Sequence, residues 1–328
     1  MKRSNKIHNA DLFTDAANEN YRKHIRTQSK QALEKIDELI DWERLIKPLA
    51  QRIDEDKKRK SEAGRKPHDL LVIVKCLLLQ MMYGLSDPRL EEELADRRSF
   101  QIFVGLVSGD SIPDETTICR YRELFARLKL DKELFKSFNR QLEERGFILG
   151  EGTIVDATLK EAQAKPSSGR DKDASFTRRG GKVLYGYKGH VGVDVDTNVI
   201  HSVEFTPAHV HDTHKFEELL LMSEKMAYGD KGYAGRRRKV WLGEVGIGCG
   251  ILAKAYRNRP LSKACCKRNK MLSRIRNRVE KPFSFFKEVL QYRRCRYFDL
   301  NRNRFQFVLC SIVYNIRRLL TLSMAKVC

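Results

Sequence analysis

A change in the hydrophobic pattern at Gly150 divides the chain into two parts with different folds. Before this position, the stretches 28–49, 70–83, 113–128 and 131–145 have the apolar periodicity of helices. After it, short β-branched or alternating stretches are separated by turn residues. The sequence therefore predicts an all-helical N-terminal part followed by an α/β part.

The order of elements after Gly150 indicates a sheet flanked by helices. The expected strands are 153–155, 185–194, 199–205, 226–228 and 248–254, and the expected helices are 212–226, 261–290 and 304–324. The polar, Gly-rich stretch 166–181 is interpreted as a mobile loop between strands.

Three domains are expected from these boundaries. Residues 1–62 form a helical arm, and the charged stretch 54–66 acts as a linker. Residues 63–146 form a second helical domain, and residues 147–328 form the α/β domain with basic C-terminal helices.

The positive charge of the chain is concentrated near its C-terminus. The net charge is +21, and residues 231–328 alone carry 25 Lys and Arg against 4 Asp and Glu. An asymmetry of this size favours a polyanionic partner, most simply nucleic acid. The basic run 236–239 fits a solvated helix face and a phosphate contact equally well.

Other protein classes are disfavoured by composition. The chain is 41% hydrophobic, which excludes a wholly disordered protein, and no apolar stretch follows the basic N-terminus, which argues against a secretory signal. The longest apolar run, 70–82, contains Lys75 and is shorter than the roughly 20 residues of a membrane span. We therefore expect a cytoplasmic protein without a membrane partner. The eight cysteines include no CxxC pair, which indicates reduced thiols rather than a disulfide scaffold or a zinc finger.

Three acidic residues stand out by their context. Asp156 and Asp230 each follow a predicted strand, and Glu280 is the only acid between Lys254 and Lys287. Carboxylates at adjacent strand ends, with a third from a facing helix, can bind two divalent cations that promote phosphodiester cleavage. Taken singly, each acid is explained as well by a turn, a cap or a helix salt bridge.

The helix around Glu280 places two cations near this acid. At about 100° per residue, Arg276, Glu280 and Lys287 lie within roughly 40° of one another on one helix face. Pro282 falls in the same stretch, and a proline inside a helix bends it and weakens this argument.

Several ordered motifs resemble those of bacterial insertion-sequence DDE transposases, closest to the insertion-sequence-five group of the insertion-sequence-four superfamily. The catalytic motifs are Val155-Asp156-Ala157-Thr158, Tyr228-x-Asp230-x-Gly232-Tyr233 and Arg276-x3-Glu280-x6-Lys287. The N-terminal motifs are Gly64-Arg65-Lys66-Pro67, Tyr83-Gly84-Leu85-Ser86-Asp87 and Pro113-Asp114-Glu115-Thr116-Thr117-x-x-Arg120-Tyr121-Arg122.

The resemblance implies a ribonuclease-H-like catalytic domain in which Asp156, Asp230 and Glu280 are catalytic and bind two Mg²⁺ ions, with Mn²⁺ as a substitute. Arg276 and Lys287 match the remaining members of the helix motif and are expected to contact DNA. Ser273 stands where the family usually has a tyrosine, so any contact from that tyrosine is in doubt. The 49 residues between the second and third acids leave no room for a large β insertion domain.

The implied function is a DNA transposase on the bacterial nucleoid. A homodimer or higher oligomer would bind the terminal inverted repeats of its element, cleave a phosphodiester and join the 3′-hydroxyl to target double-stranded DNA. Residues 63–146 and the basic C-terminal region would bind the ends, with Arg120 and Arg122 on the candidate groove helix. Two alternatives stay open: a ribonuclease-H-like nuclease without strand transfer, and a catalytically inactive, transposase-derived DNA-binding protein.

A histidine cluster precedes the predicted helix at 212. His209, His211 and His214 lie at short spacing with Asp212, which invites a zinc site. Because no further ligand pair accompanies them, a role as a cap or in structure is favoured.

Overall fold

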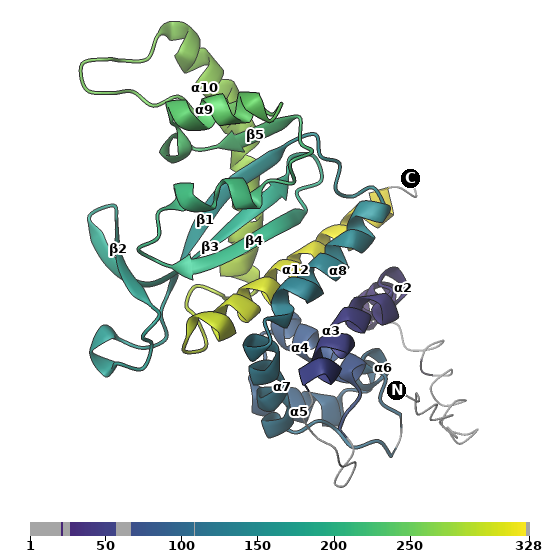
Figure 1. Cartoon of the computed structure of the whole chain (residues 1–328). Coiled ribbons are helices and arrows are strands. Elements are labelled where there is room, and N and C mark those ends of the chain that lie inside the picture. Colours follow the sequence, from purple (N-terminus) through teal and green to yellow (C-terminus); the bar gives the residue numbers. More distant parts are fainter. Residues whose placement is uncertain (1–20, 22–26, 57–66, 108, 326–328) are drawn as a thin grey trace. The chain divides into compact units, whose positions relative to one another are not determined.

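The computed structural model describes residues 21, 27–56, 67–107 and 109–325, and Figure 1 shows its helices and strands. The chain divides into two compact units, Met1–Arg122 and Glu123–Cys328. The predicted linker 54–66 lies outside the described residues from position 57 to 66, and its first three residues end a helix.

Helices make up the described part of the first unit. They are α2 (Gln28–Leu39), α3 (Trp42–Asp56), α4 (Leu70–Tyr83), α5 (Asp87–Asp96), α6 (Arg98–Val104) and α7 (Glu115–Arg127), whose last turn belongs to the second unit. The nine residues from Ile73 to Met81 in α4 are all buried. The side chain of Asp69 begins this helix by accepting the Leu71 N–H at 2.8 Å, and Gly84 ends it at a φ of 66°. The helical N-terminal part is confirmed for the described residues.

A mixed sheet forms the centre of the second unit (Figure 1). Its strands are β1 (Thr153–Glu161), β2 (Ser175–Arg179), β3 (Lys182–Asp194), β4 (Ile200–Pro207), β5 (Met226–Gly229) and β6 (Gly248–Ile251). Their order is β2-β3-β1-β5-β6, with β4 also paired to β3. Strand β3 pairs antiparallel with β1, β2 and β4. Strand β5 pairs parallel with β1 and β6. The predicted ribonuclease-H-like α/β fold is confirmed.

Helices cover both faces of this sheet. On one face, Val155 packs in a buried cluster with Phe216, Tyr233 and Leu242, the last from α9 (Arg236–Glu244). The other face meets α12 (Leu300–Ala325), which also packs on α8 (Leu130–Glu144). Gly189 of β3 makes this approach possible, because a Cβ there would lie 2.4 Å from the Phe307 ring.

Helix α12 is long and apolar enough to cross a membrane by length and composition, and it is the one such single helix among the residues searched. Its apolar window is 61% buried inside the unit, where the helix packs on β4 and α8. Its hydrophobicity is thus explained by a place in the core.

Two expectations for the second unit are wrong in part. The stretch 212–226 is no α-helix: it forms two short 3₁₀ turns, Asp212–Lys215 (η2) and Glu217–Leu219 (η3), before β5. The buried carboxylate of Glu224 accepts bonds from Thr153 Oγ1 and from the Leu221 N–H, which holds the chain in a nonhelical path. The loop expected at 166–181 contains strand β2, which pairs with β3.

The helical stretch that carries Glu280 is segmented. It comprises α10 (Lys263–Arg276), a 3₁₀ turn Asn277–Val279 (η5), α11 (Glu280–Ser284) and a π turn Phe285–Val289 (η6). Pro282 has no N–H to donate along the helix, which favours such a break. Because the turn geometry changes three times between Arg276 and Lys287, the predicted common face of a regular helix does not apply.

Candidate active site

The register of two parallel strands brings Asp156 and Asp230 to the same place. Thr153 pairs with Ala227, and Ile154 pairs with Tyr228. Asp156 and Asp230 each lie two residues beyond the last of these pairs, so the same register aligns them. Active sites in α/β folds gather at the carboxyl ends of parallel strands, and β5 ends immediately before Asp230.

Asp156 is held in a largely buried position. Its side chain is 21% exposed, and its Oδ1 accepts the Ala157 N–H at 2.8 Å. Burial raises the pKa of this carboxyl to about 6, and the negative charges of Asp230 and Asp212 add to the rise. A carboxyl whose charge is costly in this way gains from any cation that binds beside it.

Asp230 has a structural role in the turn that follows β5. It begins a short 3₁₀ turn, Lys231–Tyr233 (η4), where its Oδ1 accepts the Gly232 N–H at 2.7 Å. A Cβ on Gly232 would lie 2.9 Å from that same Oδ1. The small residue thus lets the turn close on the carboxylate, which explains the Asp-x-Gly spacing.

Arg276 connects the third acid to this pair. Its Nη2 lies 3.5 Å from Glu280 Oε1 and 3.9 Å from Asp156 Oδ2. The Glu280 side chain is 65% exposed, whereas that of Arg276 is 19% exposed. The structure therefore brings Glu280 to the region of Asp156 through the guanidinium. Within the described ranges, no three His, Cys, Asp or Glu side chains lie close enough together to hold a metal ion.

Lys287 is exposed in the π turn, and its charge acts on a buried lysine that the sequence did not single out. Lys160 lies on β1, four residues after Asp156, and burial lowers its pKa to about 8. Its Nζ donates to the Tyr292 carbonyl and lies 4.1 Å from the centroid of the Tyr292 ring. The alternation of β1 gives Lys160 the same sheet face as Asp156, and this periodicity could have identified it.

A second group of residues near the carboxylates was not predicted from the sequence to belong to the site. Asp212 Oδ1 lies 2.9 Å from Lys188 Nζ, and the charge of Asp212 reaches Asp156. From α9, Arg238 donates to the Tyr233 carbonyl at 2.9 Å and to the Thr213 carbonyl at 2.8 Å. One residue of the basic run 236–239 thus ties together the two turns that carry Asp230 and Asp212.

The histidine cluster has a local structural role. His211 is the N-cap of η2, where its Nδ1 accepts the Thr213 N–H at 3.3 Å. The His209 ring contacts Ser175 Oγ at 2.9 Å. These contacts support the interpretation as a cap and a structural element.

The two arginines of α7 differ in their surroundings. Arg120 is exposed. Arg122 is 4% exposed and donates to Asp87 Oδ2 at 2.9 Å and to Gln80 Oε1 at 3.1 Å. A guanidinium held inside the first unit in this way cannot reach a phosphate, so Arg122 is not retained as a DNA contact.

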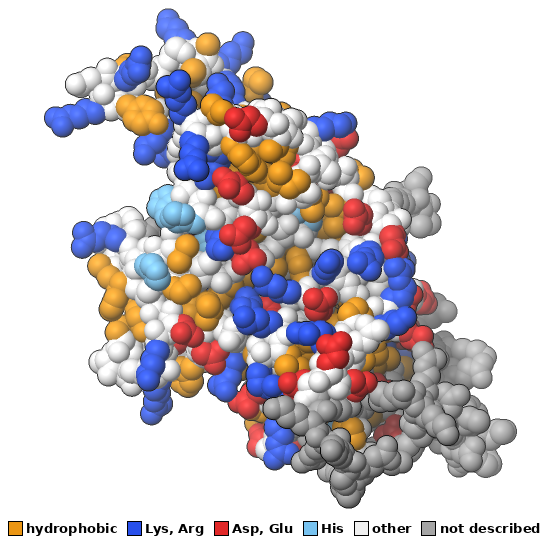
Figure 2. Space-filling model, in the orientation of Figure 1, with side chains coloured by type: hydrophobic (Ala, Val, Ile, Leu, Met, Phe, Trp, Pro, Cys, Tyr) orange, Lys and Arg blue, Asp and Glu red, His pale blue; other side chains and the backbone are white. Residues whose placement is uncertain are grey.

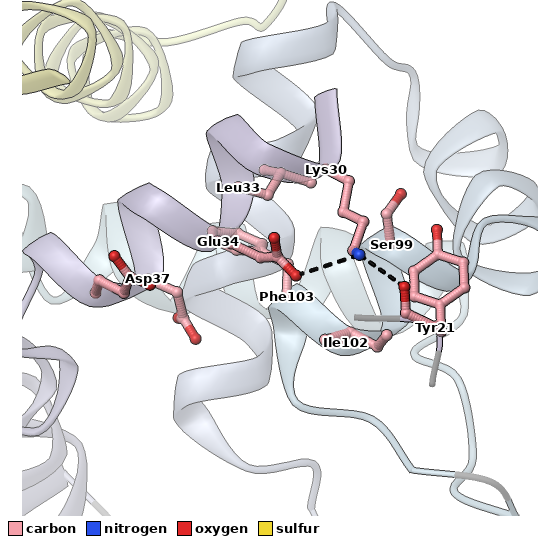
Figure 3. Close-up of a pocket in the computed structure, with 9 residues that line it drawn as sticks. Tyr21, Lys30, Leu33, Glu34, Asp37, Ser99, Ile102 and Phe103 are labelled. Atoms are coloured by element: carbon pink, nitrogen blue, oxygen red, sulfur yellow. Dashed lines mark hydrogen bonds and ion pairs between the residues drawn. The ribbon is translucent and has the colours of Figure 1, made fainter. Parts of the chain in front are cut away.

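Two hollows lie away from these carboxylates. In the first unit, Lys30 lines a hollow of about 290 Å³. There it contacts Glu34 and the Tyr21 carbonyl (Figure 3). In the second unit, α8 and β4 line a hollow of about 550 Å³ that includes the Lys132–Glu204 ion pair. Each contains internally paired charges, and neither includes Asp156, Asp230 or Glu280.

Sequence comparison connects both parts of the chain to transposases. Residues 149–316 match the family model described as the transposase DDE domain, and residues 19–124 match the one described as a transposase domain (DUF772). Among solved structures, the chain is similar to piggyBac transposase in a synaptic complex with hairpin DNA. That likeness has 10% identity and a TM-score of 0.48, and it covers 90% of this chain and 76% of the other. Because the DDE match alone spans half of the sequence, the chain belongs to the insertion-sequence DDE transposase family.

Proposed function

We propose that the protein binds the terminal inverted repeats of its own insertion sequence, cleaves a phosphodiester there and joins the resulting 3′-hydroxyl to target DNA. The observation that carries this proposal is the alignment of Asp156 with Asp230 in the β1–β5 register. The contact of Arg276 with both Asp156 and Glu280 supports the same grouping.

Two divalent cations, Mg²⁺ or in its place Mn²⁺, are the proposed cofactors. DDE transposases generally use divalent metal ions, and hard carboxylate oxygens are the ligands that such ions prefer. Asp156 and Asp230 would hold the ions, with Glu280 completing the site once its carboxylate leaves Arg276. When bound, the ions would activate a water or a 3′-hydroxyl and stabilise the leaving oxygen. The burial of Asp156 and the negative charge of Asp230 near it support this assignment, because both effects favour cation uptake beside Asp156.

The basic residues would hold the DNA backbone near the carboxylates. Arg276 is close enough to the acids to contact the reacting phosphate, and Lys287 is exposed nearby on the same helical segment. Lys and Arg side chains gather around α10 and the loop before it (Figures 1 and 2). No residue of α10 is buried, and the exposed lysines Lys263, Lys267 and Lys270 would follow phosphates. Arg120 would contribute from α7, and a dimer or larger assembly would hold two ends together.

Cleavage and strand transfer can be measured separately on oligonucleotides that carry the element's ends. D156N, D230N and E280Q are expected to abolish both steps while DNA binding persists. E244Q, which changes an exposed acid of α9, is the matched control and should retain activity.

The alternatives predict other results. A nuclease would cleave the ends but would not join pre-cut ends to target DNA. An inactive derivative would bind DNA equally with and without the D156N change and would cleave with neither. Either result would overturn the proposed function.

A further inference from the structure

The β2–β3 hairpin presents an exposed surface that is both apolar and basic. Phe176 on β2 is 56% exposed, and Val183 on β3 is 57% exposed. The side chains of Arg178 and Lys182 are exposed as well. Figures 1 and 2 show hydrophobic side chains with Lys or Arg next to them over β2, at the edge of the sheet. The sequence 174–193 contains no acid, so the hairpin itself carries no charge that neutralises its cations.

The pairing of the two strands gathers these side chains on one face. Phe176 pairs with Tyr185, and Arg178 pairs with Val183. Because paired residues and alternate residues of a strand point to the same side, all four share one face of the hairpin. The rings of Phe176 and Tyr185 lie 4.9 Å apart between centroids. The exposed apolar side chains are therefore neighbours in one patch that includes a cation.

The base of the hairpin is fixed to the rest of the unit. Ser175 Oγ accepts the His209 N–H at 2.9 Å, and the Tyr185 hydroxyl donates to the Asp171 carbonyl at 2.6 Å. Just before β2, Asp173 Oδ2 accepts the N–H of the first residue of α12 at 2.9 Å. The patch is thus preorganised, which lowers the conformational entropy lost when a partner binds.

The same patch lies on the sheet face that carries Asp156. In the β1–β3 register, Asp156 pairs with Val191, and Tyr185 lies six residues further along β3, beyond the carboxyl end of β1. An even separation keeps the face the same, and at about 3.4 Å per residue it amounts to roughly 20 Å. Duplex DNA rises about 3.4 Å per base pair, so the hairpin lies about six base pairs from the candidate active site.

An exposed cation stands between the two places on this face. Lys160 follows Asp156 on the same side of β1, and its Nζ lies 5.5 Å from the centroid of the Phe286 ring, so η6 covers this part of the face. The next residue of η6 is the exposed Lys287. A DNA backbone that leaves the carboxylates can therefore meet Lys287 and then the hairpin.

We propose that the β2–β3 hairpin docks in the major groove of the element's end DNA, about six base pairs from the cleaved bond. Arg178 and Lys182 would contact phosphates, and Phe176 and Val183 would contact base edges. The inference rests on the proposed function, because the distance is counted from the phosphodiester held at the carboxylates. A two-stranded β-ribbon fits the major groove. DNA is favoured over a second copy of the chain, because that copy also has a net charge of +21.

The apolar contact is tested by F176A. This variant should bind oligonucleotides that carry the element's ends about 5- to 10-fold more weakly, because the exposed part of the ring no longer becomes buried on DNA. Its melting temperature without DNA should change little, since the ring is largely exposed. M324A is the matched control: Met324 is 63% exposed in the last turn of α12, and its truncation should leave DNA affinity unchanged.

The phosphate contacts are tested by R178Q/K182Q. Losing two such contacts should make the plot of log affinity against log salt shallower by about 2. The control K35Q/K47Q makes the same charge change at exposed positions of α2 and α3 and should keep the wild-type slope.

The position of the contact is tested by photocrosslinking. The photoreactive residue p-benzoylphenylalanine at position 176 should crosslink to end DNA about six base pairs from the cleaved bond. The same residue at position 324 should give no crosslink there.

Wild-type affinity and salt slope in both hairpin variants would overturn the DNA contact, and if D156N still abolishes cleavage, the proposed function stands. Unchanged DNA affinity together with a loss of self-association in gel filtration would also overturn it, and would assign the patch to a second copy of the chain. If D156N cleaves normally while the hairpin variants bind DNA weakly, the proposed function fails and the hairpin contact stands.

Discussion

Arg276 Nη2 lies 3.9 Å from Asp156 Oδ2, so a guanidinium lies beside this largely buried acid of the candidate active site. This cation opposes the effects that raise the pKa of Asp156 to about 6, of which burial is the largest. The same group lies 3.5 Å from Glu280 Oε1. Arg276 therefore links the acid on β1 to the acid on α11 before any other cation binds.

Replacing Arg276 should make Asp156 harder to ionise. In R276Q, the lost positive charge no longer stabilises the carboxylate, so the pKa of Asp156 should rise by roughly one unit. Carboxyl ¹³C NMR titration of the metal-free protein measures this directly. R274Q, a change on the same helix, should leave the titration unaltered, and an unshifted Asp156 in R276Q would show that the two groups do not interact.

Substitutions of the two arginines of α7 should have different effects, one on stability and the other on DNA binding. R122A breaks a buried, hydrogen-bonded ion pair with Asp87 and should lower the free energy of unfolding by about 3 to 5 kcal/mol. R120A removes an exposed side chain and should change stability little while weakening DNA binding. Urea denaturation measures the stability of both variants, and DNA titration measures their affinity. Equal losses of stability in R122A and R120A would contradict the different roles of the two arginines.

The exposed face of α10 should account for part of the salt dependence of DNA binding. Lys263, Lys267 and Lys270 are exposed and lie within two turns of one helix. Changing all three to Gln should make the plot of log affinity against log salt shallower by about 2 to 3. The control K132Q/K136Q/R140Q makes the same charge change on α8. A wild-type affinity that does not vary with salt would rule out phosphate tracking by this region.

Gly232 should be needed to keep the carboxylate of Asp230 in its position. In G232A, the new Cβ would lie 2.9 Å from Asp230 Oδ1 and would displace it. Because misplacing a catalytic group by about 1 Å can cost roughly 100-fold in rate, cleavage should fall by 10- to 100-fold. G243A is the control, since a Cβ at Gly243 meets nothing within 4 Å. Equal cleavage rates in G232A and G243A would show that the position of the Asp230 carboxylate does not depend on a glycine at position 232.

His201 should make the second unit sensitive to mild acid. Burial lowers its pKa to about 4, and its Nε2 lies 3.0 Å from Thr153 Oγ1. The unfolded chain takes up this proton near pH 6.5, so the stabilisation is complete above that pH and is lost as pH falls towards 4. The loss should amount to roughly 3 kcal/mol.

Denaturant unfolding at several pH values between 4 and 7.5 measures this dependence. H201Q should flatten it, whereas H214Q, which changes an exposed histidine, should not. The same pH slope in H201Q and the wild type would assign the acid sensitivity to other groups.

Much of the architecture could be predicted from the sequence, because it depends on local patterns. The apolar periodicity of 70–83 predicts a helix, and α4 occupies that range. The turn between 194 and 199 predicts a hairpin, which β3 and β4 form. Asp156 and Asp230 were identified because each was expected to follow a strand. Asp230 does follow β5, whereas Asp156 lies within β1, which continues to Glu161.

Other features could not be read from local patterns. Residues 212–226 have a helical pattern, yet the buried Glu224 accepts bonds from Thr153 of β1 and from the Leu221 N–H, and these bonds hold the chain in a nonhelical path. Arg120 and Arg122 are alike in sequence, and only the position of Asp87 and Gln80 makes one of them structural. Nothing in the sequence around Tyr233 indicates that its side chain is buried.

The sequence by itself determined the order of helices and strands, the concentration of positive charge after position 231 and the three acids of the family motif. The tertiary structure decided the register that aligns Asp156 with Asp230, the place of Arg276 between two acids, and the burial of Lys160 and Tyr233. The reason is physical. Secondary structure follows from short-range periodicity and capping, whereas burial, register and charge proximity depend on segments that are far apart in the chain and meet only after folding.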